Sequence, residues 1–189
     1  MIDDRDVQRL QRLLWPKGDA TPGSLWAVLD GARDRRIHHE LLFSRLDHSC
    51  LYSGPLTTEL KLAAPYLVEL SPRYAFTQKL LAHGFGRSWG IFVRIDDWTR
   101  LRHHLRKLLT VRDESGRKLL FRWYDPRVLR NFLPTCTPAE LAEVFGPIGS
   151  FIVEDAGPAP VLQHYRFDGK RLRIETLDVD QPEEEATAC

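Results

Sequence analysis

Three short and almost continuous apolar runs most constrain the fold of this chain. They span residues 25–29, 66–70 and 89–93. Runs of about five apolar residues are typical of strands that are covered on both faces. The segments around them carry apolar residues at helical spacing, over residues 4–15, 34–46, 73–83 and from Asp96 or Asp97 to Leu109. This alternation predicts a sheet with helices packed against it.

The pattern changes after Leu109, where hairpins and short helices take over. Residues 109–112 and 118–124 flank a turn that contains a glycine, which indicates a hairpin. Short helices are predicted over residues 126–132 and 138–145, and shorter apolar segments predict three further strands over residues 148–154, 161–167 and 172–177. We therefore expect an α+β fold, with a mixed β-sheet flanked by helices and a small helical second lobe at about 125–147.

The length and composition favour one domain. The chain has 189 residues, 43% of them apolar, which is enough to bury a core without disulfides or metals. We assign residues 1–177 to this domain. Residues 178–189 hold five acids and no base, and such a segment has little apolar surface to bury, so we expect a disordered tail.

The charge and the cysteines bear on the compartment. The formal net charge is +1, so no whole-molecule attraction to nucleic acid or to a membrane is indicated. Cys50, Cys136 and Cys189 are widely spaced and odd in number, which is atypical of a disulfide framework. The N-terminus lacks the pattern of a secretory signal, and no stretch approaches the ~20 apolar residues of a membrane span. We expect a soluble cytoplasmic protein with no membrane partner.

Two features resemble ligand sites but have simpler interpretations. The histidine pairs 38–39 and 103–104 are adjacent, whereas helical metal ligands need a spacing of three or four residues. The glycine-rich segment 84–90 follows a helix and precedes a strand, the reverse of a phosphate-binding loop. We interpret this segment as a helix end and a tight turn that leads Trp89 into a buried strand. No cofactor or metal is expected.

Two alternative functions stay open at this point. An uncharacterised enzyme could use Asp125, His83 or Cys136, if a cleft gathers these side chains. A nucleic-acid-binding module could use the basic region 94–130, which has eleven Lys or Arg residues against five acids, with interleaved aromatics. The balanced overall charge favours a solvated basic face for that region, and no nucleic-acid partner is our expectation.

The most informative segment is residues 121–134. Pro126 restricts the residue before it to extended or turn geometry, so Asp125 can cap a helix that starts at Pro126. Capping explains the Asp-Pro pair but does not explain the preceding Trp123 and Tyr124. A corner this aromatic either anchors the fold or presents a binding surface, and both possibilities stay open.

At this segment the chain resembles the effector adaptor (chaperone) family of bacterial type VI secretion systems, catalogued as domain of unknown function 4123. The resemblance covers about residues 25–155 through blocks that occur in order. The blocks are residues 26–34, 50–56, 64–70, 86–92, 121–129, 132–135 and 145–147. Each block is weak alone, and their ordered occurrence carries the resemblance.

The resemblance implies a binding protein and no enzyme. Such adaptors bind a toxic effector in the producing cell and help to join it to the spike (valine-glycine repeat) protein of the secretion tube. From the residues themselves, the candidate contact side chains are Arg87, Trp123, Tyr124, Arg127 and Arg130, with Asp125 and Pro126 as a structural motif. We expect the client to occupy an apolar groove with a polar rim.

Overall fold

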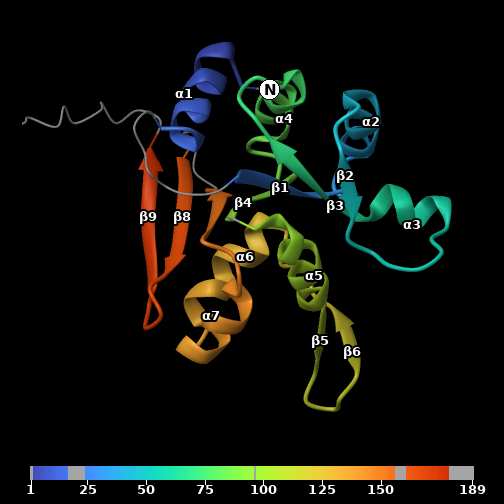
Figure 1. The fold of residues 1–189 in the computed structure, drawn as a ribbon, viewed down its shortest axis with the longest axis vertical. Coiled ribbons are helices and arrows are strands. Elements are labelled where there is room, and N and C mark those ends of the chain that lie inside the picture. Colours follow the sequence, from blue (N-terminus) through green and yellow to red (C-terminus); the bar gives the residue numbers. More distant parts are fainter. Residues whose placement is uncertain (1, 17–23, 96, 156–160, 179–189) are drawn as a thin grey trace, which may run out of the picture.

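The computed structural model describes residues 2–16, 24–95, 97–155 and 161–178, and a seven-stranded antiparallel sheet forms its centre (Figure 1). The strands run in the order β2-β3-β1-β4-β7-β8-β9. They comprise β1 (Ser24–Asp30), β2 (His48–Cys50), β3 (Pro65–Leu70), β4 (Gly90–Ile95), β7 (Ser150–Glu154), β8 (Val161–Phe167) and β9 (Leu172–Asp178). A separate hairpin consists of β5 (Thr110–Arg112) and β6 (Lys118–Leu120).

The α-helices occur where the sequence predicts them, whereas the 3-10 helix η1 was not predicted. They are α1 (Asp4–Leu14), α2 (Arg35–Ser44), α3 (Thr58–Ala63), α4 (Ala75–Gly84), α5 (Trp98–Leu108), α6 (Pro126–Phe132), the 3-10 helix η1 (Leu133–Thr135) and α7 (Pro138–Phe145). The α+β class is therefore confirmed, and the helical segment expected at about 125–147 is present as α6, η1 and α7. No helix in the described residues is long and apolar enough to cross a membrane. The tail expected from residue 178 lies outside the described residues, apart from Asp178 at the end of β9.

One detail of the sheet differs from the sequence-based expectation of a mixed sheet, because every neighbouring pair of strands is antiparallel. The helical crossovers do connect parallel strands, β1 with β2 and β3 with β4. In each case a third strand lies between the two: β3 separates β1 from β2, and β1 separates β3 from β4. This is the split β-α-β connection, and strand insertion of this kind leaves no local signal in the sequence.

Helices α1, α2 and α4 cover one face of the sheet. Their buried side chains pack against inward-pointing residues of the central strands, such as Ala27, Leu29 and Val68. The helices contribute Val7, Leu10, Leu14, Ile37, Leu41, Phe76, Leu80 and Leu81. Helices α1 and α4 also contact each other, so this layer is continuous over the sheet (Figure 1).

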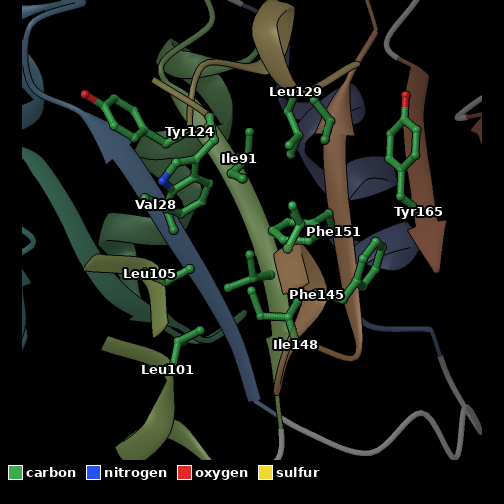
Figure 2. Packing of buried hydrophobic residues seen from close by; sticks show 14 of the residues in the cluster. Val28, Ile91, Leu101, Leu105, Tyr124, Leu129, Phe145, Ile148, Phe151 and Tyr165 are labelled. Carbon is green, nitrogen blue, oxygen red and sulfur yellow. The ribbon is translucent and has the colours of Figure 1, made fainter. Parts of the chain in front are cut away.

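Helices α5, α6 and α7 cover the opposite face. Val28 of β1, Ile91 of β4 and Leu105 of α5 belong to one buried cluster on this face, and Phe151 of β7 meets Phe145 of α7 edge to face with ring centroids 5.0 Å apart (Figure 2). Each central strand is thus buried on both faces, which is why residues 25–29 and 89–93 are apolar without strict alternation. The helices near residues 125–147 share this core with the sheet.

Local signals define the ends of these helices. The carboxylate of Asp97 accepts a hydrogen bond from the Thr99 backbone N–H at 2.9 Å, so Asp97 is the residue that caps α5. Thr137 and Glu140 form a reciprocal capping box at the start of α7. Gly116 has a φ of 79° in the turn of the β5–β6 hairpin, as its position predicts.

Replacement of Gly90 tests the packing of the central strands. Gly90 pairs with Leu29, and a Cβ at Gly90 would lie 2.1 Å from the carbonyl oxygen of Val28. We expect Gly90→Ala to lower the free energy of unfolding by at least about 1–3 kcal/mol in urea denaturation. Gly149→Ala is the matched control, because its Cβ would lie 3.6 Å from the nearest atom, the carbonyl oxygen of Arg94. Equal stability of the two variants would contradict this account.

Candidate functional site

Buried carboxylates gather at the end of the sheet where β1 finishes. They are Asp30 at the end of β1, Asp125 before α6 and Glu154 at the end of β7, and all three are buried. We call this group the polar end. A buried charge is costly unless it is paired or hydrogen-bonded, so each carboxylate needs a partner there.

Asp30 is fully buried and has two partners. One carboxylate oxygen accepts a hydrogen bond from the Ala32 backbone N–H at 3.1 Å. The other forms an ion pair with Arg122, a residue 92 positions later in the chain. This pair attaches the segment after β6 to the central strand.

Asp125 caps α6 as its position before Pro126 predicts. Its Oδ1 accepts from the Arg127 backbone N–H and from Arg127 Nε, each at 3.0 Å, and its Oδ2 accepts from Arg127 Nη2 at 2.6 Å. Burial by itself raises the pKa of Asp125, but the hydrogen bonds from Arg127 outweigh burial and hold this pKa below its ordinary value. Asp125 is therefore a charged structural residue.

Glu154 fills the glycine-rich turn between α4 and β4. Its carboxylate accepts hydrogen bonds from the backbone N–H groups of Gly86 and Ser88, each at 2.7 Å. Gly86 and Ser88 have φ values of 72° and 56°, and in this tight turn both of their N–H groups point toward the one carboxylate. Burial raises the pKa of Glu154 in spite of these bonds. The turn binds a carboxylate of its own chain, and it leads into the buried Trp89 as predicted.

Trp123 and Tyr124 belong to the core and not to the surface. Both side chains are 1% exposed, and their rings meet edge to face with centroids 5.8 Å apart. Both belong to the buried cluster that includes Val28 on the sheet face covered by α5 and α6. Figure 2 shows Tyr124 in this cluster. Of the two roles that stayed open, anchoring is correct, and their proposed role as contact residues was wrong. Large aromatic side chains bury the most apolar area, which favours this outcome.

The three candidate arginines occupy different environments. Arg87 is exposed on the turn beside the polar end. The Arg127 side chain is half exposed, although it is held by Asp125. Arg130 is mostly covered and donates to the backbone oxygen of Glu154 at 2.8 Å and to Asp155 at 3.1 Å. Arg87 and Arg127 thus present accessible surface, whereas Arg130 chiefly connects α6 to β7.

The structure does not bring together the residues of the enzyme alternative. His83 lies on α4, which covers one face of the sheet, whereas Asp125 and Cys136 flank α6 and η1 on the opposite face. Burial raises the pKa of the Cys136 thiol, which disfavours its reactive thiolate. Among the described residues, no group of three or more His, Cys, Asp or Glu side chains could hold a metal ion.

The basic region 94–130 is largely engaged within the protein. Arg94 is buried against the carbonyl oxygen of Leu14, and Arg106 donates to the carbonyl oxygens of Cys50 and Tyr52. Arg122, Arg127 and Arg130 also have the partners described above. Of the aromatics in this region, Trp98 is strongly exposed, while Trp123 and Tyr124 are not available for stacking on bases.

A groove between α2 and α4 is a surface feature that the sequence-based predictions did not include. It has a volume of about 310 Å³. Apolar side chains of Phe43, Leu46, Tyr74 and Phe76 line it, with Glu40, Arg73 and Lys79 among the polar lining residues. Phe43 is 71% exposed and Tyr74 is 39% exposed. We call this feature the α2–α4 groove.

A signal for the groove was present in the sequence. Ile37 and Leu41 form the buried face of α2, one helical turn apart. Leu42 and Phe43 follow at once and must point away from that face, because successive helical residues differ by about 100°. Apolar residues out of phase with the buried face indicate an exposed contact surface.

The charge of Asp125 gives a testable pH dependence. Its folded-state pKa lies below its ordinary value of 3.8, so the charge stabilises the fold above about pH 4 and loses this effect as the pH falls through the folded-state pKa. Asp125→Asn retains a cap but loses the charge, and we expect a loss of about 1 kcal/mol at pH 7. Chemical denaturation should show wild type and Asp125→Asn converging toward pH 3. A constant difference between pH 7 and pH 3 would contradict this assignment.

Comparison with known proteins identifies the family of the chain. No curated protein and no solved structure matches it significantly. One family model does match, over residues 25–143, from β1 through most of α7, and its description is domain of unknown function (DUF4123). Because this match spans more than half of the 189 residues, the chain belongs to the DUF4123 family.

Proposed function

We propose that this protein is an adaptor, or chaperone, of a bacterial type VI secretion system. It binds a toxic effector in the cytoplasm of the producing cell and helps to load it onto the spike protein. Membership of the DUF4123 family supports the proposal, together with the ordered blocks that resemble such adaptors. The α2–α4 groove is the observation that carries the binding role.

The chemistry of the groove suits an apolar segment of a client protein. Burial of an exposed phenylalanine side chain contributes about 1.5–3 kcal/mol, so Phe43 is a strong potential anchor. Lys79 Nζ lies 3.0 Å from the Glu40 carboxylate, and this ion pair provides a polar rim beside the apolar floor. An apolar centre with a polar rim is the usual arrangement for binding an amphipathic helix.

The scaffold beneath the groove is well suited to hold its shape. Ile37 and Leu41 of α2 and Leu80 and Leu81 of α4 are buried in one common core with β1 and β3. Helices α2 and α4 also contact each other directly. A pre-organised groove loses little conformational entropy when a client binds, and this favours affinity.

Co-expression with a candidate effector encoded by a neighbouring gene tests the proposal. We expect the wild-type chain to co-purify with the effector. Phe43→Asp should weaken the complex about 10-fold or more, because a charge replaces a central apolar anchor. Isothermal titration of the purified partners would measure the change in Kd.

A matched control separates the groove from general surface effects. Ile174 on β9 is 51% exposed and lies outside the groove, so Ile174→Asp should bind as wild type does. Failure of the wild-type chain to form any complex would overturn the adaptor proposal. If Phe43→Asp and wild type bind the effector with equal affinity, the adaptor proposal stands but the assignment of binding to the α2–α4 groove is wrong.

A further inference from the structure

The β5–β6 hairpin stands apart from the seven-stranded sheet. It follows α5 and projects away from the body of the molecule (Figure 1). All six strand residues are exposed, including Val111 at 40%, Leu119 at 46% and Leu120 at 56%. A two-stranded hairpin alone is at best marginally stable in water, and exposed apolar side chains on it are typical of an interaction site.

The hydrogen-bond register shows which backbone groups point outward. The N–H of Phe121 donates to the Leu109 carbonyl oxygen, and the N–H of Asp113 donates to the Arg117 carbonyl oxygen. Because bonded and non-bonded pairs alternate in an antiparallel ladder, the pairs Thr110–Leu120 and Arg112–Lys118 direct their peptide groups away from the partner strand. The outer edge of β6 therefore presents the N–H and C=O groups of Lys118 and Leu120.

One face of the hairpin continues the core of the protein. Val111 and Leu119 are opposite each other and share this face, and Leu109 and Phe121 precede them toward the body. Leu109 is buried, and Phe121 packs edge to face on Phe132 at 4.8 Å. The apolar row thus runs out of the core and ends uncovered at Val111 and Leu119.

The other face carries two like charges directly opposite each other. Arg112 and Lys118 are cross-strand partners, and such a pair destabilises a hairpin when nothing compensates it. Arg112 donates to the Gly116 carbonyl oxygen, which satisfies a donor without neutralising a charge. The nearby Asp113 accepts from Ser115 and Arg117. An acidic side chain beside Lys118 would relieve this repulsion.

We propose that the outer edge of β6 accepts an extended segment of the client as a third strand. This inference rests on the proposed adaptor function. The segment would alternate acidic and apolar residues, with apolar side chains that extend the row of Val111 and Leu119 and an acidic side chain beside Lys118. Backbone pairing with Lys118 and Leu120 would supply affinity, as in other complexes in which a peptide extends a sheet.

Two proline variants distinguish the two edges of the hairpin. Lys118→Pro removes an outward N–H and a charge from β6, and Arg112→Pro removes the same groups from β5. Neither change removes a backbone bond between β5 and β6, because both N–H groups point outward, although Arg112→Pro also removes the side-chain bond to the Gly116 carbonyl oxygen. With the effector that co-purifies with the wild-type chain as the probe, we expect Lys118→Pro to weaken binding at least 10-fold and Arg112→Pro to change it less than about 3-fold.

Hydrogen exchange on the wild-type complex provides a readout that does not depend on a variant. The amides of Lys118 and Leu120 should become protected when the effector binds. If the wild-type chain forms no complex, the adaptor proposal itself fails. If a complex forms while these amides stay unprotected and Lys118→Pro binds like wild type, only the third-strand inference fails.

A second copy of this chain is the other possible occupant of the outer edge of β6, so the experiment must also detect self-association. Light scattering would show whether the chain alone forms a dimer that Lys118→Pro abolishes. That result would assign the edge of β6 to a second copy of the chain and overturn the inference.

Discussion

The double pairing of β1 is the constraint on which the rest of the structure depends. This strand pairs with β3 on one side and with β4 on the other, over six residue pairs in each case. Its side chains alternate between the two cores, with Ala27 and Leu29 on one face and Val28 on the other. A strand buried on both faces requires a helical layer on each face, and the fold has α1, α2 and α4 on one side and α5, α6 and α7 on the other.

The same arrangement determines where the charged residues lie. Asp30 ends the central strand in a position without exposure to solvent, so its carboxylate requires a cation, which Arg122 supplies. Asp125 and Glu154 are likewise satisfied by the Arg127 side chain and by two backbone N–H groups. Charged groups whose hydrogen bonds are satisfied within the chain offer little to a ligand. This favours binding at the apolar outer surfaces over chemistry at the polar end.

The two apolar outer surfaces, the α2–α4 groove and the β5–β6 hairpin, belong to helical layers on opposite sides of the sheet. The α2–α4 groove is formed by helices of one layer, and the β5–β6 hairpin follows α5 of the other layer. A client that used both would offer two separate segments, one for the groove and one for the hairpin. Two weak contacts joined in one chain reinforce each other, because the second contact forms within the complex.

The sequence predicted the individual helices and strands well, but it did not predict which strands lie next to each other in the sheet. Caps such as Asp97 and Asp125, and the hairpin glycine Gly116, act through bonds within a few residues, so they can be recognised in a linear pattern. The insertion of β3 between β1 and β2 depends on contacts between distant residues, and the alternation of strands and helices does not reveal it. The expected mixed sheet is therefore antiparallel at every pairing.

The burial of some side chains could be predicted from the sequence, and the burial of others depended on the tertiary structure. Periodicity by itself determined which helices have an apolar face and that the strand run at 25–29 is buried, because these depend on spacing along the chain. Only the tertiary structure decided that Trp123 and Tyr124 enter the core while Phe43 and Leu120 remain outside it. Each of these side chains is apolar enough for either place. The deciding factor is whether another element covers it, and that depends on how distant segments pack together.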